Sequence, residues 1–203
     1  YGTVSVSGTS ISGSATNNVF VSNSSGNLNM TVSGPNCRIE DNDATLGNDG
    51  ILFSGDGTAS MRIEVNNCVF DNNRGDHFQM TTSAVNSAQM AVTLTGNTMT
   101  GVSGNLGGGI SLTPAGNADV VAQISNNDIS GSTSSAISLY QASTSTASAA
   151  LDASISGNVI GDSGVLGSGS ASGDGISVTR NGQGTMTVKV DNNSIRQYSN
   201  VAG

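Results

Sequence analysis

The sequence has little of what most folded domains use to build a core. It has no Trp, three Tyr, four Phe and two Pro, and only 10% of its 203 residues are charged. Chains so poor in aromatic residues are often disordered, because they cannot bury enough apolar area to offset the entropy of ordering. Hydrophobic residues nevertheless make up 35% of the chain, and they recur at regular positions. We therefore expect an ordered fold.

Basic residues are also scarce. Six Lys and Arg stand against fourteen Asp and Glu, which gives a formal charge of −8 and a pI near 4.1. This balance argues against nucleic acid as a partner. No apolar run approaches the twenty or so residues of a membrane helix, so we expect no membrane insertion. The chain begins at Tyr1 without a signal-peptide pattern, and we expect it to be part of a longer chain or assembly.

An eight-residue segment recurs seven times along the chain. It reads VTLTGNTM at 92–99 and AQISNNDI at 122–129, for example. The spacing between successive copies is close to thirty residues, and the longest interval holds a Gly/Ser-rich insertion at 164–173. Such a period is the signature of a solenoid. The apolar residues that close the seven segments are Ile11, Ile39, Phe70, Met99, Ile129, Ile160 and Ile195.

Apolar residues alternate within each segment, as in Met61, Ile63 and Val65, which is typical of a strand with one buried face. A second apolar block, such as Ile110 and Leu112, follows in each unit. We therefore predict an all-β solenoid with two strands per coil, one β-helix over residues 1–203 with about six and a half coils. A flat β-sandwich remains open as an alternative. The predicted internal stack is Met30, Met61, Met90, Val120, Leu151 and Met186.

These motifs resemble the right-handed parallel β-helix repeat of the pectin-lyase-like superfamily, in phrases such as ISNNDISG at 124–131 and GGGISL at 107–112. That fold carries lyases, hydrolases, phage tailspikes and adhesins alike. A second similarity is to adhesin repeats of autotransporter-type outer-membrane proteins. Their GGxI and FxxN signatures match 107–110, 20–23 and 70–73. This second resemblance implies a location outside the cell.

One position of the repeat carries polar residues whose amides can stack from coil to coil. Asn occupies it in the last four copies, and we expect its role to be architectural. Cys37 and Cys68, the two cysteines of the chain, occupy it in adjacent copies. Neighbouring coils bring such residues within disulfide distance. We predict a disulfide between them, with two stacked thiols as the alternative. The full column is Thr9, Cys37, Cys68, Asn97, Asn127, Asn158 and Asn193.

Acidic residues concentrate between positions 38 and 76. Aligning the repeats pairs Asp49 with Asp76 and Glu40 with Asp71 in consecutive coils. Stacked carboxylates raise one another's pKa, rotate into water or share a cation. Solvated surface charge and a calcium site both remain open here, and no other cofactor is indicated. The candidate metal ligands are Glu40, Asp41, Asp43, Asp49, Asp71 and Asp76.

Catalysis is the alternative that the charged segment raises. Carbohydrate-active β-helices use two or three carboxylates on one face, and Asp71, Arg74, Asp76 and His77 form the candidate set. They match no lyase or hydrolase motif, and aromatic platforms for sugars are scarce. The sequence therefore favours a segment with no catalytic role.

The sequence thus predicts a secreted or cell-surface β-helix shaft with a structural or adhesive role. A polysaccharide lyase, hydrolase or tailspike-like depolymerase is one alternative. A subunit of an extracellular filament built by end-to-end stacking is another. The expected partners are a cell-surface or polysaccharide ligand, together with further coils or copies at the two ends.

Overall fold

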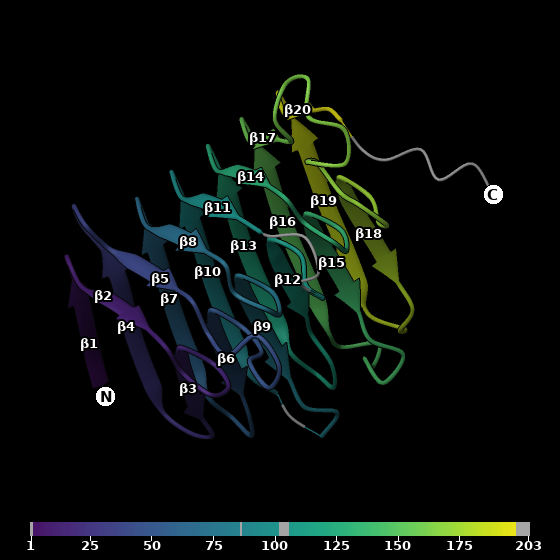
Figure 1. Cartoon of the computed structure of the whole chain (residues 1–203). Coiled ribbons are helices and arrows are strands. Elements are labelled where there is room, and N and C mark those ends of the chain that lie inside the picture. The colour runs from purple at the N-terminus through teal and green to yellow at the C-terminus, as the bar shows by residue number, and fades with distance from the viewer. Residues whose placement is uncertain (1, 86, 102–105, 198–203) are drawn as a thin grey trace.

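The computed structural model describes residues 2–85, 87–101 and 106–197. In those ranges the chain forms only strands and turns, and it contains no helix that could cross a membrane. The strands lie in three parallel sheets, and the chain visits the sheets in turn before it starts the next coil (Figure 1). Six full coils and a partial seventh result. The predicted all-β parallel β-helix is confirmed.

The long strands form sheet A, which has seven members in sequence order along the stack. Each interior strand has seven residues and alternates buried and outward side chains. Met61, Ile63 and Val65 of β7 are buried, whereas Arg62 points to solvent. The members are β1 (Gly2–Ser7), β4 (Asn27–Ser33), β7 (Ser60–Asn66), β10 (Gln89–Thr95), β13 (Asp119–Ser125), β16 (Ala150–Ser156) and β19 (Thr185–Asp191).

Very short strands form sheet B, and the five interior ones bury the closing apolar residue of their repeat. The members are β2 (Ser10–Ser12), β5 (Arg38–Glu40), β8 (Val69–Asp71), β11 (Thr98–Thr100), β14 (Asp128–Ser130), β17 (Val159–Ile160) and β20 (Ser194–Ile195). Sheet C holds the second apolar block of each unit. Its members are β3 (Val19–Asn23), β6 (Ile51–Gly55), β9 (Phe78–Thr82), β12 (Ile110–Thr113), β15 (Ile137–Gln141) and β18 (Ile176–Arg180).

The prediction of two strands per coil is wrong, because each eight-residue segment is split between sheets A and B. A residue with positive φ turns the chain between them, for example Asn67 at 56° and Gly96 at 68°. Asn and Gly are the residues that tolerate this conformation. From the third coil onward they alternate, as Asn67, Gly96, Asn126, Gly157 and Asn192.

The predicted internal stack is correct except for its first member. Met61 pairs with Leu28, and Met30 pairs with Ile63. The turn 34–37 is two residues longer than the equivalent turn 67–68 of the next coil, which displaces the alignment of the second copy by two. Because strand side chains alternate with period two, the shift leaves Met30 facing inward but in the neighbouring column.

The interior is a single stack of aliphatic side chains, with Phe53, Phe70 and Phe78 in its N-terminal half. The inward-facing residues of the two end coils are far less covered. Val4 of β1 is 41% exposed, and Val178, Val190 and Ile195 at the other end are 44%, 50% and 45% exposed. These residues occupy the columns whose inner members are fully buried.

The turns that join sheet B to sheet C, here called the B–C corner, alternate in length. They have six residues in the first, third and fifth coils and nine or more in the second, fourth and sixth. The predicted Gly/Ser-rich insertion lies in the longest of them. The short turns are 13–18, 72–77 and 131–136, and the long turns are 41–50, 101–109 and 161–175.

Candidate functional site

The Asn column predicted from the sequence forms a continuous ladder at the turn between sheets A and B. Asn97, Asn127 and Asn158 are each at most 1% exposed. The Oδ1 atom of Asn127 accepts hydrogen bonds from the backbone N–H and the Nδ2 of Asn97, at 3.0 and 2.9 Å. The Nδ2 of Asn127 donates to Leu94 O and to Asn158 Oδ1. The pattern repeats from Asn158 to Asn193.

Every donor and acceptor of the Asn127 and Asn158 amides is therefore used, because an amide group supplies two of each. Bonds run to the coil below and to the coil above. Buried polar groups that are fully paired stabilise a unique arrangement, whereas an unpaired one costs about 1–3 kcal/mol. The ladder, here defined as Asn97, Asn127, Asn158 and Asn193, fixes the stacking register of the C-terminal half.

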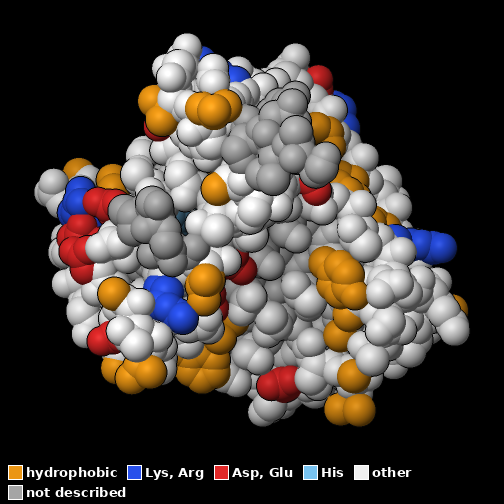
Figure 2. Space-filling model, turned by 45° about the vertical axis from the view of Figure 1, so that its right-hand side comes forward, with side chains coloured by type: hydrophobic (Ala, Val, Ile, Leu, Met, Phe, Trp, Pro, Cys, Tyr) orange, Lys and Arg blue, Asp and Glu red, His pale blue; other side chains and the backbone are white. Residues whose placement is uncertain are grey.

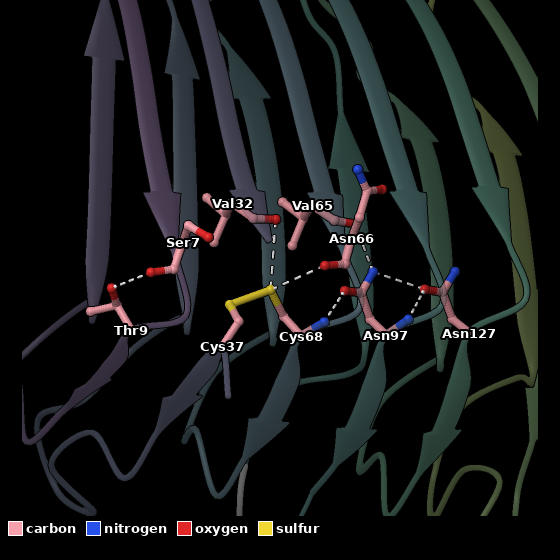
Figure 3. Close-up of a disulfide and its surroundings, with 9 residues drawn as sticks. All are labelled: Ser7, Thr9, Val32, Cys37, Val65, Asn66, Cys68, Asn97 and Asn127. Atoms are coloured by element: carbon pink, nitrogen blue, oxygen red, sulfur yellow. Dashed lines mark hydrogen bonds between the residues drawn. A yellow bond between two sulfur atoms is a disulfide. The ribbon is translucent and has the colours of Figure 1, made fainter. Parts of the chain in front are cut away.

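Cys37 and Cys68 continue this column and form the predicted disulfide (Figure 3). Their Cα atoms are 4.8 Å apart and both residues are 1% exposed. The backbone N–H of Cys68 donates to Asn97 Oδ1 at 3.0 Å, so the disulfide and the asparagine ladder join directly. A covalent bond thus replaces the amide bonds between the second and third coils.

A second ladder, which the sequence pattern does not indicate as such, lies at the B–C corner. Here the side-chain oxygen of one coil accepts the backbone N–H of the next. Asn17 Oδ1 accepts from Asp49 N at 2.9 Å, Asp49 Oδ1 from Asp76 N at 3.0 Å, and Asp76 Oδ1 from Gly108 N at 2.7 Å. Gly108 has no side chain, so the ladder ends there and resumes only with Ser135 and Asp174. We call this column the oxygen ladder.

The predicted stacking of Asp49 on Asp76 is thereby confirmed. Asp49 is 2% exposed, and its Oδ2 accepts from Asn48 Nδ2 at 3.0 Å. Burial raises the pKa of Asp49 to about 7, and the Asp76 carboxylate adds to this rise. Burial also raises the pKa of Asp76, although the Gly108 N–H opposes the shift. Asp76 borders an open hollow of about 280 Å³ that Gln79, Leu106 and Ser134 also line.

Glu40 and Asp71 pair in register, but a cation of the protein lies between them. Arg38 contacts Glu40 at 2.5 Å and Asp71 at 3.9 Å. The hydrogen bond from Arg38 lowers the pKa of Glu40. Asp43 instead accepts the backbone N–H groups of Leu46 and Thr45 within its own turn, and these lower its pKa. Asp41 accepts from Asn72 Nδ2.

The six candidate metal ligands therefore fall into separate places. Asp49 and Asp76 form one pair and Glu40 and Asp71 another, while Asp41 accepts from Asn72 of the next coil and Asp43 bonds within its own turn. In the part of the chain that the structure describes, no three Asp, Glu, His or Cys side chains gather as a metal site. Asp49 and Asp76 are the pair without an Arg partner, so the calcium prediction now applies to these two residues.

His77 points into the interior, 2% exposed and with its ring 6.1 Å from that of Phe70. Its Nδ1 lies 3.1 Å from Asn73 Nδ2, which also donates to Ile39 O. Asn18 Nδ2 donates in turn to Asn73 Oδ1. Because Asn73 supplies a donor, the Nδ1 of His77 is the acceptor and the ring is neutral. Burial lowers the pKa of His77 to about 4.

The candidate catalytic set does not converge on one point. His77 faces the interior, and Asp76 faces the hollow at the B–C corner. Arg74 donates to Gly47 O, and Asp71 lies beside Arg38. Each of these groups thus has different partners. They are not arranged as an acid and a base on the two sides of a substrate bond.

The outer face of sheet A carries three shallow hollows along the stack. Their described lining residues include no aromatic side chain. Two ion pairs on this face join residues of a single strand, Arg62 with Glu64 at 2.6 Å and Lys189 with Asp191 at 3.3 Å. The face in Figure 2 is mostly polar and uncharged, with hydrophobic side chains in separate small patches.

Comparison with known proteins adds no family to these observations. No known protein family matches the sequence, and no curated protein and no solved structure matches it.

Proposed function

We propose that this chain is a rigid shaft segment of a secreted or surface-displayed protein, with a structural or adhesive role. One observation carries the proposal: the buried polar side chains bond from coil to coil along the axis. A binding or catalytic pocket concentrates polar groups on one point, whereas Asn97, Asn127 and Asn158 spread theirs along the stack.

The disulfide supports the extracellular part of the proposal. Cys37 and Cys68 are bonded, and disulfides persist in oxidising compartments such as the cell exterior. The resemblance of segments 107–110, 20–23 and 70–73 to adhesin repeats of autotransporter-type outer-membrane proteins points to the same setting. The outer surface, with its few charges, would then offer a polar face to a polysaccharide or cell-surface ligand.

An assay of polysaccharide cleavage tests this proposal directly against the enzymatic alternative. The purified chain is incubated with a panel of neutral and acidic polysaccharides, and new reducing ends and unsaturated products are followed over time. We expect no release above the blank. Polymer shortening that Asp76→Asn abolishes and Asp152→Asn leaves intact would overturn the proposal and establish a depolymerase.

A second candidate is end-to-end stacking, and the exposed inner residues of the end coils favour it. Val178, Val190 and Ile195 present the apolar columns of the interior at one end, and Val4 presents them at the other. Further coils, either from a longer chain or from an identical subunit, would cover them. Head-to-tail contacts of identical subunits do not close and give filaments.

Light scattering across a hundredfold concentration range tests this candidate. Growth with concentration that Val190→Glu prevents would support stacking of identical copies. A monomer at every concentration would exclude it.

A further inference from the structure

An exposed leucine projects from each long turn of the B–C corner. Leu46, Leu106 and Leu166 lie in the second, fourth and sixth coils, and they are 70%, 63% and 76% exposed. Val165, beside Leu166, is 54% exposed. The leucines are sixty residues apart, so they form a row with one member in every second coil. Apolar side chains gathered on a protein surface are typical of interaction sites.

Hydrogen bonds hold this row in place. The backbone N–H of Leu106 donates to Arg74 O of the third coil at 2.8 Å. The N–H of Leu46 donates to Asp43 Oδ1 at 2.7 Å, and that of Val165 donates to Asp162 O at 3.2 Å. The backbone at each projecting leucine is therefore fixed relative to the stack.

Hollows lie where the short turns leave the edge recessed between the long ones. One hollow of about 680 Å³ extends over the fifth coil, and Thr133, Val165 and Leu166 are among its lining residues. A second, of about 280 Å³, extends over the third coil and is bordered by Gly75 and Leu106. Leucines and hollows thus alternate along the edge, one coil apart. Surfaces with matching projections and recesses can pack with the complementarity of a protein interface.

A second copy of the chain, turned end for end, can match this pattern. In an antiparallel pair whose two-fold axis passes between the third and fourth coils, the second coil faces the fifth, the fourth faces the third, and the sixth faces the first. Long turns then face short turns at all six positions. A parallel pair with equal coils opposed would instead place long turns against long turns. Turn length therefore favours the antiparallel pair.

The charges of the six turns favour the same pairing. Turns 41–50, 72–77 and 161–175 carry every Asp and Arg of the corner, and turns 13–18, 101–109 and 131–136 carry no charged residue. In the antiparallel pair each charged turn faces an uncharged one. In a parallel pair the acidic turns would face their own copies, and like charges across an interface disfavour association. A shift of the antiparallel pair by two coils would leave two coils of each copy unpaired and would oppose charged turns.

We propose that the B–C corner is a self-association surface through which two copies of this chain form an antiparallel, side-by-side dimer. Leu106 lies next to the two-fold axis and contacts Leu106 of the second copy. Each Leu46 enters the hollow over the fifth coil of the other copy. The contact is isologous and closes on itself, unlike end-to-end stacking, which adds subunits without limit. This inference does not depend on the proposed shaft function.

The length of the edge sets the expected strength of the dimer. Six coils at ordinary interstrand spacing span about 24 Å. An edge of this length buries less than the roughly 800 Å² per partner of a standard interface, so we expect a reversible dimer with a dissociation constant of about 10 µM to 1 mM.

Sedimentation equilibrium from about 1 µM to about 2 mM measures this association, and we expect monomer and dimer without larger species. Leu106→Glu places two carboxylates beside the two-fold axis and should raise the dissociation constant at least about tenfold. Val85→Glu is the matched control, since Val85 is 94% exposed and lies between β9 and β10, outside the B–C corner. It should leave the constant unchanged, and so should Val190→Glu at the end of the stack.

Cysteine cross-linking tests the register. Ala44 of the second coil and Thr133 of the fifth lie on facing coils in the dimer, but within one chain they are three coils apart, about 14 Å, which is too far for a disulfide. Under mild oxidation Ala44→Cys/Thr133→Cys should therefore give a covalent dimer, and neither single variant should.

Three results would overturn the proposal. The first is a wild type that stays monomeric up to about 2 mM, above the upper limit expected for so short an edge. The second is a dimer that persists in Leu106→Glu, and its loss in Val190→Glu would assign the association to the chain ends. The third is cross-linking of Ala44→Cys alone as fast as the double variant, which would indicate that equal coils face each other.

Discussion

Two columns of polar side chains run along this solenoid, and they differ in one chemical respect. The asparagine ladder at the A–B turn uses amides, which donate and accept in equal number. The oxygen ladder at the B–C corner relies on Asp49 and Asp76, which accept hydrogen bonds but bring charge. The first ladder can therefore continue without limit inside the stack. The second ends after two carboxylates, at Gly108.

A polar side chain can be buried here when it forms hydrogen bonds with the equivalent side chains of the neighbouring coils. Asn97, Asn127 and Asn158 are almost inaccessible, and all their polar atoms are paired. The carboxylates of the oxygen ladder have partners too, but their pKa values rise because burial disfavours the charge. The amide column therefore carries no penalty from charge, whereas the carboxylate column disfavours the charged form of its members.

Breaking the asparagine ladder in its middle should have the largest effect. Asn127→Ala removes bonds to Asn97, Asn158 and Leu94 O and leaves buried donors and acceptors without partners. We expect a loss of about 3–5 kcal/mol in the free energy of unfolding, measured by denaturant titration. Asn181→Ala, at an exposed Asn that bonds Tyr140, is the control and should cost little. Equal costs in the two variants would show that the ladder contributes no more than surface hydrogen bonds.

Removal of the disulfide, which belongs to the same column, should have the next largest effect on the free energy of unfolding. Its sequence separation of 31 residues corresponds to about 3–4 kcal/mol of chain entropy. We expect the double variant Cys37→Ser/Cys68→Ser to lose about this much. The double variant Cys37→Asn/Cys68→Asn should recover part of the loss, because an amide at 68 would reach Val32 O, which Cys68 Sγ now approaches at 3.6 Å.

Chemical denaturation of both double variants beside the oxidised and reduced wild type measures this difference. An Asn pair that is no more stable than the Ser pair would show that the N-terminal coils cannot support an amide ladder. Alkylation without reductant, followed by intact-mass measurement, checks that the wild type carries no free thiol.

Forcing open the B–C corner should have a smaller effect. Gly75→Ala would place a methyl group against Asp49 Oδ1 and the backbone of Asn48, and overpacking of this kind costs about 1–3 kcal/mol. The control is Gly26→Ala, where the glycine has positive φ but nothing within 4 Å of the added atom. Its cost should be about 1 kcal/mol, from backbone conformation alone. Thermal melts compare the two, and a Gly75→Ala variant as stable as wild type would contradict the close packing of the corner.

The predicted response to calcium is the smallest. At pH 8, which lies above the pKa of about 7 that burial gives Asp49, 1 mM calcium with a Kd of about 0.1–1 mM would add about 0.4–1.4 kcal/mol. Thermal melts with calcium and with chelator measure this, and Asp76→Asn should abolish the rise. An unchanged wild-type melt would leave both carboxylates as ladder members without a metal.

The fold and one ladder could be predicted from the sequence because a solenoid repeats its contacts at a fixed interval. The closing residues Ile39 and Phe70, for example, stack as the alignment requires, and the Cys column becomes a disulfide. The split into three sheets was missed, since positive φ at Asn67 or Gly96 is invisible in an alternating pattern. The displacement of Met30 was missed because the extra residues of turn 34–37 lie within the repeat.

The site was less predictable, for a physical reason. The pairing of Asp49 with Asp76 follows from register alone. The part played by Asn17 and Gly108 depends on backbone N–H groups that carry no sequence signal. The separation of Asp76 from His77 likewise depends on the direction of each side chain at a turn, which composition and spacing do not fix.

The alternation of turn lengths at the B–C corner gives the molecule a longer translational period than its thirty-residue repeat. Equivalent long turns recur only every second coil, about 9.6 Å along the axis at ordinary interstrand spacing. Each of them carries an exposed leucine followed by glycine, at Leu46, Leu106 and Leu166, sixty residues apart. The true module of the chain is thus a pair of unlike coils. A partner that binds along this edge would meet equivalent turns after a shift of two coils and unlike turns after a shift of one coil.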